Sequence, residues 1–274
     1  MKRVFVLTSI SVILFKVSSV SAVPGQQVKI KSFAHWCQQI VFVPAATRQT
    51  IKVLLIKAGT EDCQIADEKL RNLTDLDLAG NQINDLEPIA SLSKLKILNL
   101  SSNRIADLKP LASLSNLEIL NLSSNVVTDL KPLTSLSNLD TLGLMDNQIS
   151  DIKPLEGLRK LNFLTLIGNQ VSDIKPLAGL VNLRDLSLNE NQVSDLTPLT
   201  GLVSLRDLSL MANRISDVQP LSKLTNLTTL SLHINQITDV KPLRRLVNLK
   251  KLSFKFYNPI IDKECPVKPE SICE

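Results

Sequence analysis

The sequence is poor in the residues from which enzyme sites are usually built. Aromatic residues make up 3% of the 274 residues, and the only histidines are His35 and His233. The chain has no glycine-rich phosphate loop and no Cys or His spacing typical of a metal site. The sequence places no Ser, Cys or acidic partner beside either histidine. It therefore predicts a protein that is not an enzyme and that carries neither a cofactor nor a metal.

A strong charge of one sign is also missing. The formal net charge is +5, but Lys2, Arg3 and Lys16 lie in an N-terminal leader segment that has no acidic residue. Without these three, 28 of the 31 basic residues remain against 26 acidic ones, a balance of about +2. This balance gives no support to a nucleic-acid partner.

Long hydrophobic runs are confined to the leader. Residues 1–22 are predicted to be a signal peptide, with basic Lys2 and Arg3, an apolar run from Val4 to Phe15, and small residues at the cleavage site. This run is short for a membrane span. Lys16 leaves an uncleaved anchor as the alternative. We expect a secreted or periplasmic protein with no stable membrane insertion after cleavage.

One 22-residue pattern is repeated eight times without insertion from Leu73 to Asn248, and a truncated ninth copy starts at Leu249. Its skeleton is L-x-x-L-x-L-x-x-N-x-[IV]-x-D-[LIV]-x-P-[LI]-x-x-L. Such a period indicates a solenoid, and the alternating L-x-L centre predicts a short strand with one buried face. We predict an α/β repeat solenoid: a curved, right-handed arc with a parallel sheet on the concave face and short 3₁₀ or helical turns on the convex face.

Two polar columns run through the repeats. One is Asn, which can satisfy backbone groups where the chain turns inside a coil: Asn81, Asn103, Asn125, Asn147, Asn169, Asn191, Asn213 and Asn235. The other is Asp, a favoured helix N-cap, followed by Pro: Asp85, Asp107, Asp129, Asp151, Asp173, Asp195, Asp217 and Asp239. A calcium site is the alternative for the Asp column, but such a site needs several oxygens that converge on one point.

The repeat pattern resembles the internalin-type, 22-residue class of bacterial leucine-rich repeat proteins. This resemblance implies a curved solenoid whose concave sheet binds a protein ligand. We expect the solenoid to span residues 73–256, with an N-terminal helical cap at 23–72 and a C-terminal cap at 257–274. A binding solenoid of this kind is expected to be a monomer.

The caps contain all four cysteines, Cys37, Cys63, Cys265 and Cys273. The end coils of a solenoid need a polar or fastened cap, so among the three pairings we favour Cys37–Cys63 and Cys265–Cys273. Zinc is the less favoured alternative.

Local patterns predict the structure of each cap. FAHWCQQ predicts a short helix, and AATRQTIKVLLIKAG a second one that stops at Gly59. Residues 65–72 look like a degenerate half-coil, and Tyr257 occupies the Asn position of the ninth copy. With the HWCQQ segment, the tail resembles small secreted cyanobacterial proteins of the internalin-A-like type, which implies an extracytoplasmic location and disulfide-bonded caps.

The variable strand positions are the candidate binding residues. Positions 3, 5 and 7 of each copy should project from the concave face, with position 2 at its margin. We predict a ligand-binding surface that comprises Met145, Phe163, Ile167, Arg184, Asp185, Arg206, Asp207, Met211 and His233. Its apolar centre and charged rim are typical of an interface, although single exposed apolar residues are also common on soluble proteins.

Two functions are therefore open. The favoured one is a non-enzymatic, extracytoplasmic protein-binding module that uses the concave face, with a ligand of unknown identity. The alternative is a passive structural or envelope-associated scaffold. A convex column of Lys109, Lys131, Lys153, Lys175 and Lys241 is interpreted as a solvated face, although it could meet an acidic polymer.

Overall fold

The computed structural model of the chain describes residues 30–261 and 264–273. The predicted signal peptide, residues 1–22, lies outside the described residues. Nine parallel strands follow one another in chain order in a single sheet. They are β1 (Asp75–Asp77), β2 (Ile97–Asn99), β3 (Ile119–Asn121), β4 (Thr141–Gly143), β5 (Phe163–Thr165), β6 (Asp185–Ser187), β7 (Asp207–Ser209), β8 (Thr229–Ser231) and β9 (Lys251–Ser253).

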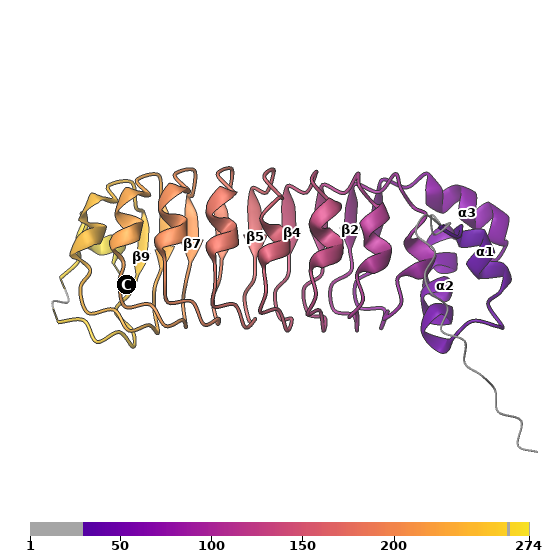
Figure 1. Ribbon diagram of the computed structural model, residues 1–274, viewed down its shortest axis with the longest axis horizontal. Helices are drawn as coiled ribbons and strands as arrows, with labels where there is room; N and C mark the ends of the chain where they lie inside the picture. The colour runs from indigo at the N-terminus through magenta and orange to yellow at the C-terminus, as the bar shows by residue number, and fades with distance from the viewer. Residues whose placement is uncertain (1–29, 262–263, 274) are drawn as a thin grey trace, which may run out of the picture.

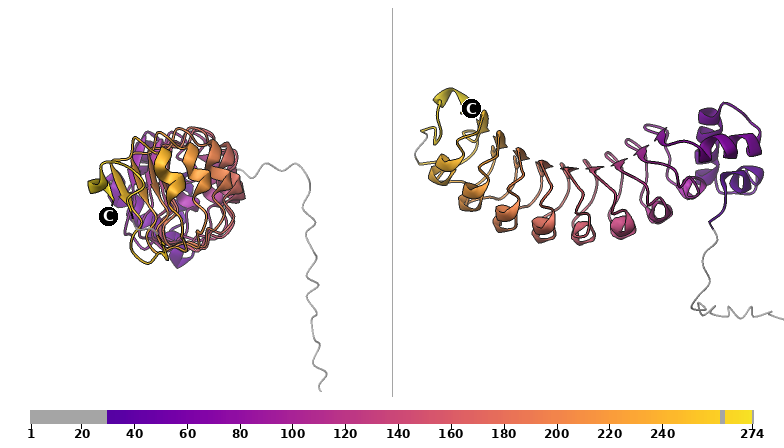
Figure 2. Two further views of the ribbon diagram at one scale, coloured as in Figure 1. Left: turned by 90° about the vertical axis from the view of Figure 1, so that its left-hand side faces the viewer. Right: turned by 90° about the horizontal axis from the view of Figure 1, so that it is seen from above.

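The sheet forms the inner face of an arc, which confirms the predicted solenoid. Each strand pairs with the strand 22 residues later, for example Leu142 with Leu164. The leucines at the middle of the strands are buried, whereas the residues on either side face outward to varying degrees. Figure 2 shows the strands on the concave side and the helical turns on the convex side. Because one face of every strand points into the coil, the core is a continuous column of aliphatic side chains.

Short 3₁₀ helices form the convex side of the coils. They are η1 (Glu87–Ile89), η2 (Lys109–Ser113), η3 (Lys131–Ser135), η4 (Lys153–Leu155), η5 (Lys175–Gly179), η6 (Thr197–Gly201), η7 (Gln219–Lys223) and η8 (Lys241–Arg245). A carboxylate oxygen of Asp107 accepts the backbone N–H of Lys109 at 2.9 Å, and the bond recurs in each of these coils. The Asp column thus caps the turns as predicted, from one residue before the N-cap residue.

The Asn column forms a buried ladder. In Asn147, Oδ1 accepts the N–H of Val127 at 2.9 Å, while Nδ2 donates to the carbonyls of Leu122 and Leu144 at 3.0 and 3.2 Å. From Asn103 onward, each such side chain joins its own coil to the preceding one. The predicted structural role of these asparagines is confirmed, because they pair backbone groups that would otherwise be buried without partners.

A second asparagine ladder occupies the last position of the repeat, where the sequence analysis assigned no role. Asn116 Nδ2 donates to the carbonyl of Ser93 at 2.8 Å. Four more residues make the equivalent bond to the preceding coil: Asn138, Asn182, Asn226 and Asn248. Unlike the first ladder, this one lies near the surface.

The ninth coil departs from the predicted register. Tyr257 stands at the position expected for Asn, but Asn258 performs the role: Nδ2 donates to the carbonyls of Leu232 and Phe254 at 2.8 Å, and Oδ1 accepts the N–H of Ile237. Tyr257 instead has a φ of 53°, like Ile234 just before the Asn of the previous coil. The assignment of Tyr257 to the Asn position was wrong, because one additional residue lies between β9 and the turn.

Three helices cover the N-terminal end (Figure 1): α1 (Phe33–Gln38), α2 (Ala45–Ala58) and α3 (Cys63–Arg71). The two predicted helices are confirmed, and α2 stops at Gly59, which is left-handed. The half-coil predicted for residues 65–72 was wrong. That segment is helical because Asp62 caps the amides of Gln64 and Ile65, and because Asp67 and Arg71 form an ion pair at 2.7 Å one turn apart.

Both ends of the described chain are fastened by disulfides. Cys37 pairs with Cys63, which joins α1 to α3, and Cys265 pairs with Cys273, as favoured from the sequence. The backbone of Cys273 also forms an isolated parallel β-bridge with Leu252 of β9. The tail, with η9 (Glu270–Ile272), thus covers part of the last strand, which would otherwise be an open sheet edge.

Candidate functional site

The exposed face of the sheet carries three rows of side chains, of which the row at the first strand position is the most varied. The strand register pairs each residue of this row with the residue 22 positions later on the next strand. From the N-terminal end it contains Asp75, Ile97, Ile119, Thr141, Phe163, Asp185, Asp207, Thr229 and Lys251. After Asp75, the row therefore changes from apolar residues, interrupted by Thr141, to acidic ones between β5 and β6.

Three of the predicted residues form a central patch, which consists of Met145, Phe163 and Ile167. Phe163 is 40% exposed, and Met145 and Ile167 are half-buried. The N–H of Asp146, next to Met145, donates to the carbonyl of Ile167 at 2.8 Å, so these two residues are neighbours on adjacent coils. Met211 is half-buried two coils beyond Ile167, with Asn189 between them, and lies apart from the central patch.

A buried hydroxyl lies within this patch. Thr165 lies between Phe163 and Ile167 on the same face of β5, is buried, and its Oγ1 has no hydrogen-bond partner among the described residues. Its neighbour in register is Gly143, where a Cβ would lie 2.7 Å from Asn121 Oδ1. Because glycine has no Cβ, the Asn121 side chain can occupy the space next to residue 143.

Two further apolar residues belong to the same face but were not selected from the sequence. Ile97 and Ile119 are 39% and 36% exposed, close to the value for Phe163, and they are paired on β2 and β3. We refer to Ile97, Ile119 and Phe163 as the apolar row. The sequence contained the information needed to select Ile97 and Ile119, because all three residues occupy the third position of their repeats.

Asp185 and Asp207, here called the acidic pair, are direct neighbours on β6 and β7. Both are half-buried. Burial raises the pKa of Asp185, and a hydrogen bond with Asp207 and the charge of that residue raise it further, whereas Arg184 and Arg206 oppose the shift. Among the ion pairs of the described residues, none involves either carboxylate. The two groups thus repel each other on a partly desolvated surface.

Arg184 and Arg206, which the sequence pattern grouped with this pair as one rim, lie beside it, where their charges lower the pKa of Asp185. Both arginines are exposed at the sheet margin and, with Lys250, line a shallow hollow of about 420 Å³. Ser204, Asn226, Thr228 and Asn248 complete its lining, which contains no carboxylate. Alternation along the strand places the arginines at this margin, because adjacent residues project in different directions.

His233 is engaged with the last coil. Its Nδ1 accepts the N–H of Phe256 at 3.2 Å, and the two rings meet edge to face with centroids 5.2 Å apart. Since this contact also accommodates the additional residue of the ninth coil, it gives His233 a structural role whatever else the side chain does.

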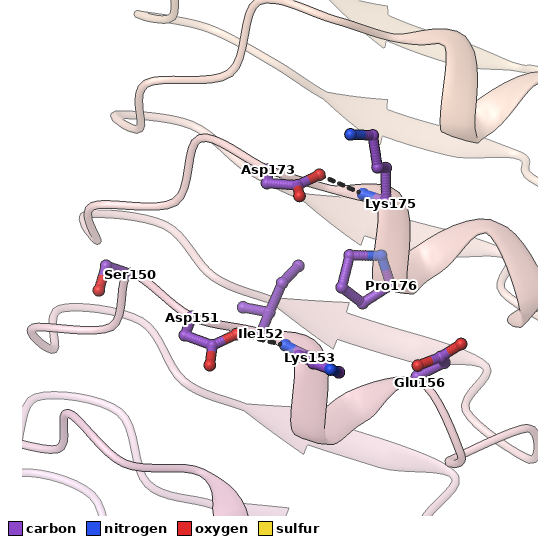
Figure 3. A pocket seen from close by; sticks show the side chains of 8 residues that line it. All are labelled: Ser150, Asp151, Ile152, Lys153, Glu156, Asp173, Lys175 and Pro176. Carbon is purple, nitrogen blue, oxygen red and sulfur yellow. Dashed lines mark hydrogen bonds between the residues drawn. The ribbon is translucent and has the colours of Figure 1, made fainter.

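The convex side has hollows of mixed charge. One, of about 410 Å³ between η4 and η5, is lined by Asp151, Lys153, Glu156, Asp173 and Lys175 (Figure 3). Asp151 and Asp173 there cap the helical turns by accepting the N–H groups of Lys153 and Lys175. In residues 30–261 and 264–273, no group of three or more His, Cys, Asp or Glu is arranged to hold a metal ion. None of the helices in the described ranges is long and apolar enough to cross a membrane.

A parallel sheet on the inside of an arc, held by a buried asparagine ladder and bearing variable side chains on its free face, defines a solenoid scaffold of the leucine-rich type. The chain belongs to the leucine-rich repeat family: the model described as "Leucine Rich repeats (2 copies)" matches eight overlapping windows, residues 71–113, 93–135, 115–157, 137–179, 159–201, 181–223, 203–245 and 225–265. No curated protein matches the chain.

Solved structures of two Listeria monocytogenes proteins are similar to the chain. Internalin C2 is 38% identical with a TM-score of 0.71, covering 74% of this chain and 91% of its own. The internalin InlF is 31% identical with a TM-score of 0.66, covering 79% of this chain and 71% of its own. The fold is thus internalin-like.

A plant receptor ectodomain is similar over part of its length. The leucine-rich repeat ectodomain of the Arabidopsis thaliana receptor kinase GASSHO1/SCHENGEN3 is 25% identical with a TM-score of 0.60, covering 68% of this chain and 24% of its own. Its structure was solved in complex with CASPARIAN STRIP INTEGRITY FACTOR 2.

Proposed function

We propose that this protein is a non-enzymatic binding module that holds a protein ligand on the concave face of its sheet. The observation that carries the proposal is the exposure of Phe163, Ile97 and Ile119 in one row of a sheet face that has no covering layer. A solvated sheet face is normally polar, and contiguous apolar groups bordered by charge are typical of protein interfaces.

The similar structures support the same function. Solenoids of this shape offer a long concave surface to a partner, and the plant receptor ectodomain was solved with a factor bound. We extend this role to the concave face of the present chain, with a ligand whose identity is open and with the protein acting as a monomer. We also assign the chain to the 22-residue class and to the small cyanobacterial type, on the repeat period and the cap motifs of its sequence.

We place the protein outside the cytoplasm, either secreted or in the periplasm. Disulfides persist in oxidising compartments, and the chain has one at each end of the described solenoid. The signal peptide predicted at residues 1–22 would supply the route, and the remaining chain would not insert stably into a membrane.

Affinity capture from the envelope fraction and culture medium of the source organism tests the proposal. The bait is the purified protein, and the test variant is Ile119→Asp/Phe163→Asp, which places charge on the apolar row. Val126→Asp/Val181→Asp is the matched control, because these valines are 41% and 51% exposed outside the strands. All three proteins are first compared by thermal unfolding.

We expect one partner protein to bind both the wild type and the control variant in a saturable manner. The test variant should not capture this partner. Equal retention by all three proteins would refute a concave binding site. Salt-sensitive attachment to the envelope with no saturable partner would favour the passive scaffold.

A further inference from the structure

The free face of the sheet changes character between β5 and β6. Phe163 is the last apolar member of its row, and its neighbour in register is Asp185, followed by Asp207. Towards the N-terminal end the row contains Ile119 and Ile97. An apolar surface and a pair of carboxylates therefore meet within two steps of the solenoid.

The acidic pair is compensated only in part by the cations near it. Arg184 and Arg206 directly precede Asp185 and Asp207 in the chain and lower the pKa of Asp185, but the net shift is still upward. Both arginines line the hollow at the margin, and no ion pair joins them to either carboxylate in the described part of the chain. Two like charges opposite each other on adjacent strands are unfavourable. A cation supplied from outside would relieve this repulsion.

We propose that the ligand contributes an extended segment that runs along the solenoid axis, with an apolar side chain on Phe163 and a Lys or Arg side chain between Asp185 and Asp207. This inference rests on the proposed function and specifies the partner: a segment of a protein in which an apolar and a basic residue are close in sequence.

The strand spacing fixes their separation. Neighbouring strands lie about 4.8 Å apart, so a point midway between β6 and β7 is roughly 7 Å from β5. An extended chain advances about 3.3 Å per residue, and residues two apart project to the same side. The apolar and basic residues of the segment are therefore separated by one residue, in either chain direction.

A second observation concerns a buried hydroxyl in the same part of the face. Thr165 is the only residue on the sheet face whose buried side-chain oxygen has no hydrogen-bond partner among the described residues. It lies directly after Phe163 and Leu164 on β5, next to the step where the row becomes acidic. Buried hydroxyls normally find a partner, so the face has an unpaired polar group beside the point where the extended segment would lie.

A library of random 12-residue peptides displayed on phage tests the inference. The library is selected on the purified wild-type protein, and single enriched peptides are then synthesised and titrated by fluorescence anisotropy. The test variant is Asp185→Asn/Asp207→Asn, which keeps side-chain shape and removes both charges. The control is Asp75→Asn/Asp140→Asn, which removes the same net charge from other coils, at β1 and just before β4.

We expect enriched sequences to carry Lys or Arg one residue away from an aliphatic or aromatic residue. Their affinity should fall at least about tenfold in the test variant, since a charge-assisted contact is lost, and remain within about twofold in the control. Substituting the basic residue of the peptide with Gln should abolish the difference between wild type and test variant.

Three outcomes would overturn the inference: no enrichment, enrichment without the spaced basic residue, or equal affinity for both variants. A separate outcome is a set of peptides that bind the wild type and both Asp variants with equal affinity but fail to bind Ile119→Asp/Phe163→Asp. That result would support binding on the concave face and refute only the contact between a basic residue and the acidic pair. Failure of the proposed function itself is recognised separately, by affinity capture in which that apolar-row variant retains everything that the wild type retains.

Discussion

Asp185 and Asp207 lie opposite each other in register on adjacent parallel strands of the sheet. The folded protein holds a proton on Asp185 more tightly than the unfolded chain does, because its pKa is raised above the ordinary value of 3.8 by burial and by Asp207. This part of the stability is present below the unfolded pKa and is lost as the pH rises through the folded pKa. The pair therefore costs stability at neutral pH.

The first prediction is that Asp185→Asn stabilises the protein at neutral pH. The gain should be about 0.5 kcal/mol, within the range of cross-strand pairs, and it should shrink as the pH falls from neutral towards the raised pKa of Asp185, because that carboxyl is then protonated in the folded wild type as well. Urea unfolding across this pH range measures it. Asp75→Asn is the control, because Asp75 pairs in register with Ile97 and not with another acid. A loss of stability at neutral pH would contradict the repulsion.

The second prediction contrasts adjacent residues of β5. Phe163→Ala should cost less than about 1 kcal/mol because much of the ring is already in solvent, whereas Leu164→Ala should cost about 3 kcal/mol by leaving a cavity in the core. The two side chains are 40% and 0% exposed. Chemical denaturation of both variants gives the comparison, and equal losses would mean that Phe163 belongs to the core.

The third prediction separates the two asparagine ladders. Asn147→Ala should cost roughly 3 kcal/mol, because it leaves the amide of Val127 buried without a partner and removes one of the two asparagine bonds to each of the carbonyls of Leu122 and Leu144. Asn116→Ala removes a comparable bond at an exposed site and should cost less than about 1 kcal/mol, since water replaces the side chain. Hydrogen exchange of the Val127 amide reports the local effect. Similar costs would show that burial does not distinguish the ladders.

The fourth prediction concerns the cap disulfides. Cys37 and Cys63 are 26 residues apart, and Cys265 and Cys273 are 8 apart. In the chain-entropy model, replacing each pair by Ala costs about 3.5 and 2.5 kcal/mol respectively. Because a solenoid is held by contacts between neighbouring coils, hydrogen exchange should rise first at the affected end. Uniform exchange along the whole chain in either variant would instead indicate one cooperative unit.

The candidate site shows how far the repeat pattern reaches. Position 3 of the repeat identified Phe163 as a concave residue, and the same position contains the exposed Ile97 and Ile119, which the sequence analysis passed over. The repeat period already aligns these residues, and what the structure adds is that Ile97 and Ile119 are about as exposed as Phe163. The pattern also grouped Arg184 with Asp185, and the structure shows that Arg184 lines the hollow at the margin while its charge lowers the pKa of Asp185.

The sequence by itself determined the solenoid, its coil length and the roles of its Asn and Asp columns, because each of these depends on interactions that recur at every repeat. Tertiary structure decided what occurs only once. Residues 63–71 are helical because capping and one ion pair favour a helix there. Asn258 takes the role expected at position 257 because its side chain is the one that forms hydrogen bonds with the amide and carbonyl of the preceding coil. The charge conflict between Asp185 and Asp207 likewise arises only when stacking brings residues 22 positions apart into contact.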